Sequence, residues 1–183
     1  MDVTADTTRW TLVTYRVPQD PSRHRVALWR ELKRAGAISL QQATWALPSR
    51  VATTDVIERV LALVDRAGGD AYVFSADPAG EAMGARLEEL FVEAREDEWG
   101  EFVRECDKFD AEIDHEIQTR KFTAAELDEE EQNLERLRRW FRELRARDVL
   151  GAPTAAVAEV RLKASAERLD AFAEQVFEAG GGR

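Results

Sequence analysis

The sequence predicts an α+β protein, with a ferredoxin-like domain over residues 1–77 and an antiparallel bundle of long helices over residues 78–183. Three observations lead to this fold class. Strand and helix patterns alternate in the order β-α-β-β-α-β up to residue 77, which is the order of the split βαβ arrangement. Beyond residue 77 the apolar residues recur at helical spacing, and no strand pattern occurs. The connections between these later helices are short, which favours antiparallel neighbours.

The strands of the first domain are predicted from stretches rich in β-branched and aromatic residues. The first is WTLVTYRV at residues 10–17, which Pro18 ends, and the last is DAYVFSAD at residues 70–77. Between them, AISLQQATWALPSR contains two short extended pieces that bend near Gln42–Ala43 or form a tight hairpin.

Two helices are predicted between these strands. The first begins after Ser22, a plausible N-cap, and ends at Gly36. We expect Val26, Trp29 and Leu32 on its buried side, because they share one helical stripe. The second follows the N-cap candidates Thr53–Asp55 and ends at a pair of glycines.

Three long helices are predicted in the second half. The first follows Pro78, with an interruption near Asp97–Gly100. The second runs from Thr123 to Leu150 and opens with the capping box Thr123-Ala-Ala-Glu126. The third follows Pro153, and its expected buried stripe comprises Val160, Leu162, Leu169, Phe172 and Val176.

Charge is unevenly distributed along the chain. Residues 1–76 contain ten Lys and Arg against eight Asp and Glu, which gives a net charge of +2. Residues 77–183 carry a net charge of −12, so the whole chain has a net charge of −10. Such asymmetry suggests that the two halves have different roles. The single cysteine, Cys106, excludes an internal disulfide framework. No apolar run approaches the roughly 20 residues that span a bilayer, so we expect a cytoplasmic protein.

Two segments of the chain resemble a known family. They are YRVPQDPSRHRVALWRELKRAGAISLQQATWALP, which begins at Tyr15, and KFTAAELDEEEQNLERLRRWFRELRARDVLGAP, which begins at Lys121. Together they resemble the N-terminal region of the ChrB family of chromate-resistance proteins. The first segment is more distantly similar to the ferredoxin-like domain of the phenylacetate-catabolism repressor PaaX and to the small CRISPR-associated adaptor that shares that fold. The resemblance implies a cytoplasmic regulator that binds the promoter of a chromate-efflux operon and responds to chromate. Members of the family commonly carry a further C-terminal domain. If sensing resides in that domain, this chain is expected either to bind DNA without sensing or to work alongside a separately encoded partner.

The first helix carries the residues expected to contact DNA. Phosphate contacts need cations clustered on one face of a compact domain. The predicted phosphate-binding residues are Arg23, Arg25, Arg30, Lys33 and Arg34. A solvated basic face is the simpler interpretation of the same residues.

Chromate is a tetrahedral dianion, which guanidinium groups and the N–H groups at a helix N-terminus would bind. The predicted oxyanion-binding residues are Arg16, Ser22 and His24 around the first helix, and Arg138, Arg142 and Arg145 on the central long helix. The three central arginines have a structural alternative, which is ion pairing with Glu105, Glu112 and Glu116 of the preceding helix.

No catalytic residue, cofactor or metal site is predicted. Glu112-x-x-His115 resembles a di-iron motif, but a di-iron site needs a second copy that the sequence lacks. Cys106 falls at a core position, and Trp29, Trp45, Trp99 and Trp140 are also expected in the core.

The sequence therefore predicts a chromate-resistance regulator that binds promoter DNA and is not an enzyme. A homodimer is expected, because ferredoxin-like domains offer exposed sheet edges and most operators are palindromic. The alternative is an interaction or stress-response module without DNA affinity, which acts through its acidic helical bundle.

Overall fold

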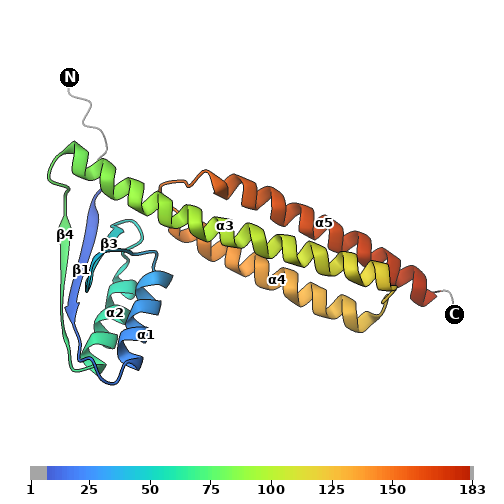
Figure 1. The fold of residues 1–183 in the computed structure, drawn as a ribbon, viewed down its shortest axis with the longest axis horizontal. Helices are drawn as coiled ribbons and strands as arrows, with labels where there is room; N and C mark the ends of the chain where they lie inside the picture. The colour runs from blue at the N-terminus through green and yellow to red at the C-terminus, as the bar shows by residue number, and fades with distance from the viewer. Residues whose placement is uncertain (1–7, 182–183) are drawn as a thin grey trace. The chain divides into compact units, whose positions relative to one another are not determined.

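The computed structural model describes residues 8–181 and confirms the predicted fold class (Figure 1). A four-stranded antiparallel sheet with two helices is followed by three long helices. The chain forms two compact units. One comprises the residues up to Ala94 together with Ala146–Leu150, and the other comprises Arg95–Arg145 with the residues from Gly151 onward.

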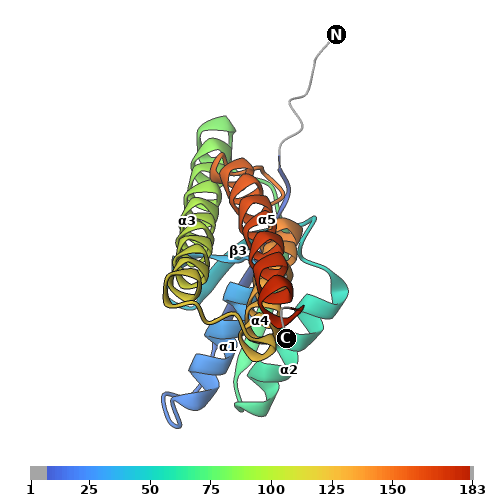
Figure 2. The same ribbon diagram turned by 90° about the vertical axis from the view of Figure 1, so that its right-hand side faces the viewer.

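The first unit has the predicted β-α-β-β-α-β order. Its elements are β1 (Trp10–Arg16), α1 (Arg23–Arg34), β2 (Ile38–Gln41), β3 (Thr44–Pro48), α2 (Thr54–Arg66) and β4 (Asp70–Ala76). The sheet order is β2-β3-β1-β4, with both β-strand neighbours of β1 antiparallel to it. Helices α1 and α2 lie side by side against one face of the sheet (Figures 1 and 2). Of the two predicted geometries between β2 and β3, the tight hairpin is present, and its turn residue Ala43 has a φ of 64°.

The core between the sheet and its two helices corrects one prediction. Its buried members are Val13, Leu28, Leu32, Ala37, Trp45, Leu47, Val60 and Val64. Leu32 is buried as expected, but Val26 is 42% and Trp29 49% exposed. Residues 26–29 are all apolar. Of these four, the helix buries Leu28, because Leu28 and Leu32 are four residues apart and share one face of the helix.

The opposite face of the sheet is partly covered by the start of α3 (Glu81–Thr119). Trp10, Ile38 and Ala46 form a second buried cluster with Phe91 of α3. The rings of Trp10 and Phe91 meet edge to face, with centroids 6.1 Å apart. Helix α3 is continuous through Gly100, so the predicted interruption near Asp97–Gly100 is wrong.

The second unit packs the rest of α3 against α4 (Ala124–Arg147) and α5 (Thr154–Gly181), and the three helices run alongside one another (Figures 1 and 2). Trp99 is fully buried, and its ring lies 5.2 Å from that of Phe141. Trp140 is half-buried, with its ring 5.3 Å from that of the buried Phe102. None of the helices within residues 8–181 combines the length and hydropathy that a bilayer-spanning segment needs.

The predicted stripe of α5 is partly wrong. Leu169, Phe172 and Val176 are buried, but Val160 is 67% exposed. Its expected place on the buried side is taken by Ala155, Ala158 and Ser165. Small residues allow neighbouring helices to approach closely, and here they turn Val160 outward.

Half of the predicted capping box is present at the start of α4. The backbone N–H of Glu126 donates to Thr123 Oγ1 at 3.2 Å. The reciprocal bond is replaced, because the N–H of Thr123 donates to the carbonyl of Lys121. Helix α4 ends at Arg147, three residues before the predicted Leu150, and Gly151 follows with a φ of 78°.

Thr123→Ala should destabilise the protein, because it leaves the N–H of Glu126 without its acceptor. The expected cost is about 1 kcal/mol, which lowers the melting temperature of a chain of this size by roughly 2–4 °C. Thermal unfolding followed by circular dichroism measures this, with Thr123→Ser as the control that keeps the acceptor. An unchanged melting temperature in Thr123→Ala would mean that this bond does not stabilise α4.

Glu130 of α4 is a carboxylate buried among other carboxylates. It lines a groove between α3 and α4 and is only 3% exposed. Burial raises its pKa, and the nearby Glu112, Glu129 and Glu116 raise it further, against a hydrogen bond from Asn133. The ionised side chain is therefore held in an unfavourable place at neutral pH.

Glu130→Gln should raise the melting temperature at pH 7. The pKa of Glu130 is higher in the folded than in the unfolded protein, so its contribution to stability is lost as the pH rises through the folded pKa. The advantage of the variant should disappear as the pH falls through the ordinary glutamate range. Thermal unfolding at several pH values tests this, and Glu131→Gln is a control with the same change of charge at an exposed position outside the carboxylates that raise the pKa of Glu130. Equal effects of the two substitutions would contradict the assignment to burial.

Candidate nucleic-acid interface

Helix α1 presents most of its cations on one exposed side. Leu28 and Leu32 bury the other side against the sheet. At about 100° per residue, Arg23, Arg30, Lys33 and Arg34 fall within an arc of about 100°. All four side chains are exposed, and we call these four residues the basic stripe.

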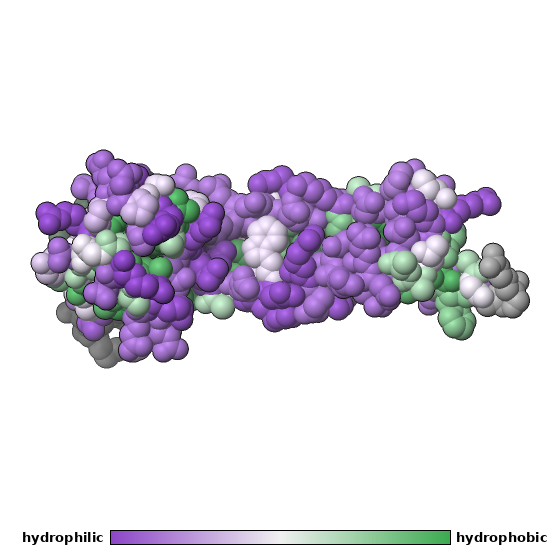
Figure 3. All heavy atoms as spheres, turned by 90° about the horizontal axis from the view of Figure 1, so that it is seen from below, coloured by the Kyte–Doolittle hydropathy of each residue, from purple (hydrophilic) through white to green (hydrophobic). Residues whose placement is uncertain are grey.

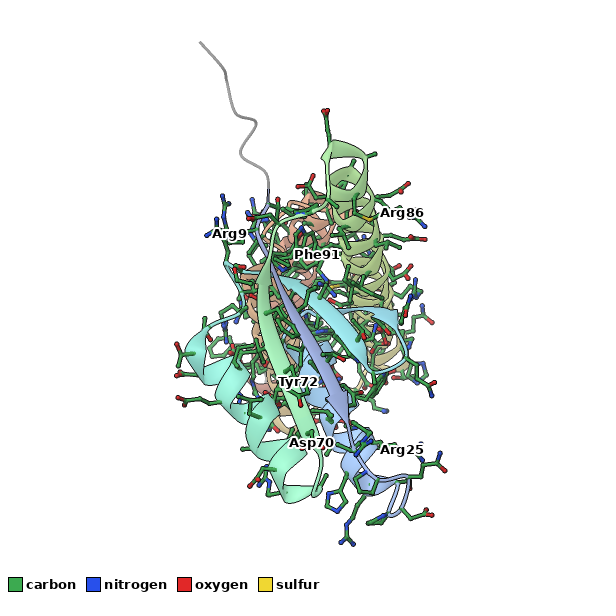
Figure 4. All side chains as sticks on the ribbon, turned by 90° about the vertical axis from the view of Figure 1, so that its left-hand side faces the viewer. Arg9, Arg25, Asp70, Tyr72, Arg86 and Phe91 are labelled. Atoms are coloured by element: carbon green, nitrogen blue, oxygen red, sulfur yellow. The ribbon has the colours of Figure 1, made fainter. Side chains whose placement is uncertain are left out.

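Arg25 does not belong to the basic stripe. It is exposed at the start of α1, about 200° around the helix from Arg23 (Figure 4). The structure therefore brings four of the five predicted phosphate-binding residues onto one face and leaves the fifth outside it.

The residues of the basic stripe differ in whether they have acidic partners. Arg34 lies 3.6 Å from Glu31, whose carboxylate also accepts a hydrogen bond from Arg59 of α2 at 2.7 Å. By contrast, the side chains of Arg23, Arg30 and Lys33 form no hydrogen bond or ion pair with any residue in the described range 8–181. Three mobile and uncompensated cations on one helix face suit contacts with phosphate groups.

Trp29 is the residue of this surface that the sequence analysis placed wrongly. Trp29 is 49% exposed. At about 100° per residue it lies about 40° around the helix from Lys33, at the border of the basic stripe. A large exposed aromatic side chain among cations is typical of interaction surfaces. The sequence contained a signal for this exposure. Leu28 and Leu32 are four residues apart, so they can form the buried side of the helix and leave Trp29 outside it.

The oxyanion-binding residues predicted around α1 are close in sequence but form little local structure. Ser22 occupies the N-cap position in an α-helical conformation, with φ −56° and ψ −23°, and makes no side-chain capping bond. The expected cap is therefore absent, because the preceding turn already bonds the N–H of His24 to the carbonyl of Pro21. Arg16 is 89% exposed and lies 3.9 Å from Asp70.

The arginines predicted on the central helix belong to the second unit, where α4 holds them in an exposed position. Arg142 donates to Glu135 at 3.0 Å and lowers the pKa of that carboxyl group, and Arg138 lies 4.0 Å from the same residue. Arg145 has no such partner among residues 8–181. The α4 side of the bundle, seen from below in Figure 3, is predominantly hydrophilic.

The predicted ion pairs between α4 and the preceding helix are wrong. Glu105 pairs with Lys108 of its own helix, and Glu116 pairs with Lys121 at 3.1 Å. Glu105 and Lys108 lie three residues apart, at a spacing that places side chains side by side on one helix, and Lys121 follows the end of α3. Cross-helix pairs do occur between α3 and α5, where Arg161 bonds Asp107 and Asp110 and Arg168 bonds Asp114.

Within residues 8–181, no three His, Cys, Asp or Glu residues are grouped as a metal ion would require. The candidate binding groups are the exposed cations on α1 and the arginines on α4, of which Arg138 and Arg142 pair with Glu135 of their own helix.

Comparison with known proteins places this geometry in a family. A family model described as the N-terminal part of protein ChrB matches residues 25–182, which include three of the four residues of the basic stripe, all but Arg23, and the whole of the three long helices. No curated protein and no solved structure matches the chain. Because the match extends over most of the sequence, the chain belongs to the ChrB N-terminal family.

Proposed function

We propose that this chain is a cytoplasmic regulator of chromate resistance that contacts promoter DNA through the basic stripe of α1. Membership of the ChrB family associates it with chromate resistance. The observation that supports DNA contact is the set of uncompensated cations Arg23, Arg30 and Lys33 on one exposed helix face.

The acidic second half does not prevent this contact. Residues 77–183 carry a net charge of −12, which repels a polyanion. At physiological salt, however, the Debye length is about 8 Å, so repulsion over longer distances is largely screened. The local charge of α1 then decides whether phosphates approach. The exposed ring of Trp29 adds a surface for apolar contact beside the phosphate contacts, which by themselves carry no sequence information.

For the response to chromate, we propose competition at the start of α1. A chromate dianion needs guanidinium groups and free backbone N–H groups. Arg23 supplies an uncompensated guanidinium at the first turn of α1, next to Ser22 and His24. An anion bound there removes a cation from the basic stripe and weakens the hold on DNA.

Replacing Arg30 and Lys33 together with Ala should weaken binding to all DNA sequences. Each lost phosphate contact lowers the slope of log K against log salt by about 0.9, so the double variant should flatten the slope by about 1.8. Fluorescence anisotropy with the DNA upstream of the gene, over a series of salt concentrations, measures both quantities. Adding chromate should weaken wild-type binding more than chloride does at the same ionic strength.

The matched control is Arg138→Ala with Arg142→Ala. It removes the same number of positive charges from residues that are already paired with Glu135. An intact slope in the α1 variant together with lost binding in the α4 variant would place the DNA contact on α4 and contradict the proposal.

An interaction module without DNA affinity is the second candidate function, and one observation favours it. Three large apolar residues of α5 are strongly exposed: Val157 at 52%, Val160 at 67% and Phe177 at 81%. Exposed apolar side chains of this size suit a protein partner. Absence of DNA binding even at low salt would favour this function over the regulator.

Cys106 is not expected to take part in sensing, although chromate is an oxidant. Its side chain is fully buried, and burial raises the pKa of its thiol to about 11. The thiolate is the reactive form, and at neutral pH it is almost absent here.

Cys106→Ala should therefore keep the DNA affinity and the chromate response of the wild-type protein. In the native wild-type protein, a thiol reagent should label Cys106 only as fast as the bundle opens, and unfolding in denaturant should release rapid labelling. Fast native labelling, or loss of the chromate response in the alanine variant, would show that the thiol is accessible and involved.

A further inference from the structure

The two edges of the sheet in the first unit are built differently. Strand β2, at one edge, has four residues and an irregular register between Ser39 and Gln41. Strand β4, at the other edge, has seven residues and pairs with β1 without a shift. Short edge strands and bulges are devices that prevent pairing with other chains. β2 has both, whereas β4 has no bulge, proline or lysine.

The backbone of β4 has hydrogen-bonding groups directed away from the sheet. The N–H of Tyr15 in β1 donates to Ala43, on the β3 side. Successive residues of a strand alternate in direction, so Leu12 and Thr14 face β4 and bond their partners Phe74 and Tyr72. The N–H and C=O groups of the intervening residues of β4 then point to the free edge. These residues are Ala71, Val73 and Ser75.

The side chains of β4 are also unusually apolar for an exposed edge. Tyr72 is 64%, Phe74 51% and Val73 36% exposed. Tyr72 and Phe74 lie on the face opposite α1 and α2, and Val73 lies on the helix-bearing face. Figure 4 shows Tyr72 and Asp70 on β4, at the outer edge of the sheet.

We propose that β4 pairs with β4 of a second copy of this chain, antiparallel and around a two-fold axis at Val73. Val73 is the central residue of the strand, and its backbone groups face outward, as a hydrogen-bonded pair on the axis requires. Tyr72 then lies opposite the partner's Phe74, and Ala71 lies opposite the partner's Ser75. The pairing satisfies the outward backbone groups of three residues on each strand and covers the exposed aromatic rings.

The charges at the two ends of β4 favour a second copy as the occupant. Asp77 pairs with Arg9 at 3.2 Å, and Asp70 lies 3.9 Å from Arg16. The two-fold axis brings the Asp70 end of one strand next to the Asp77 end of the other. Each end of the paired β4 strands then holds the carboxylates of Asp70 and Asp77 and the guanidinium groups of Arg9 and Arg16, one ion pair from each chain. Opposite charges can therefore alternate there. A nucleic-acid strand would instead meet a carboxylate at both ends of β4.

The first test is the molecular mass in solution. Light scattering at micromolar concentration should give twice the chain mass of 20.7 kDa for the wild-type protein and a single chain mass for Val73→Pro. Proline at this position removes only an outward N–H, so the sheet itself loses no hydrogen bond. An unchanged far-ultraviolet circular dichroism spectrum checks that the variant is folded.

The second test fixes the register by disulfide cross-linking in a Cys106→Ala background. Residues of a hydrogen-bonded antiparallel pair have Cα atoms about 5.5 Å apart, within the range that a disulfide spans. Val73→Cys should therefore cross-link to itself. Ser75→Cys is the matched control on the same edge, because its two copies would lie roughly 14 Å apart. A mixture of the Ala71→Cys and Ser75→Cys proteins should cross-link with each other.

Three results would overturn the proposal. They are a monomeric wild-type protein, a dimer whose mass Val73→Pro leaves unchanged, and equal cross-linking of Val73→Cys and Ser75→Cys. Loss of DNA binding in a Val73→Pro protein whose wild type is monomeric would identify nucleic acid as the occupant instead. Because mass and cross-linking are measured without DNA, failure here is distinguishable from failure of the proposed DNA contact.

Discussion

The packing of Leu28 and Leu32 into the core of the first unit determines which side of α1 faces water. These two side chains join Val13, Trp45 and Leu47 from the sheet in one buried cluster. Because this side of the helix is buried, the opposite side faces water, and Arg23, Arg30 and Lys33 on that side are exposed. The acidic residue of α1, Glu31, is 9% exposed and is engaged by Arg59. The same packing therefore exposes the cations and withdraws the carboxylate that would neutralise them.

The face of the sheet opposite α1 and α2 is covered over some of its strands and exposed over β4. Phe91 at the start of α3 seals Trp10, Ile38 and Ala46. The cover does not extend to Tyr72 and Phe74 of β4, which remain more than half exposed. Large aromatic side chains lose favourable burial when they stay in water. Helix α3 thus covers only part of this face. The β4 edge stays exposed and apolar, and a second chain paired with β4 would cover it.

Most of the correct predictions concern features that depend on neighbouring residues. The order of the elements and the bond from the N–H of Glu126 to Thr123 are present, and the β2–β3 hairpin is one of the two geometries that the sequence allowed. The Ser22 cap is also a local feature, but it is absent. The rotation of a helix is different, because it depends on what the helix packs against. α1 has four consecutive apolar residues at 26–29 and α5 is rich in alanine, so both sequences allow more than one buried side.

The partners of the long charged side chains were predicted wrongly, because more than one carboxylate was within possible reach. Arg142 bonds Glu135, seven residues earlier on its own helix, rather than a carboxylate on α3. The candidate site divides in the same way. The cations of α1 were visible as a cluster in the sequence, but the exposure of Trp29 and the position of Arg25 outside the basic stripe needed the fold.

The two arginine-rich helices show why the number of cations is a poor guide to a phosphate-binding surface. An exposed ion pair is worth only about 0–1 kcal/mol, so Glu135 does not lock Arg138 and Arg142 in place. What Glu135 changes is the local charge. A phosphate that approaches paired arginines also approaches a carboxylate, and fewer counterions are released when it binds. On α1 the only acidic side chain is buried under Arg59, so an approaching phosphate meets Arg23, Arg30 and Lys33 without that repulsion. The absence of exposed carboxylates, more than the presence of arginines, distinguishes α1 from α4 as a surface for DNA.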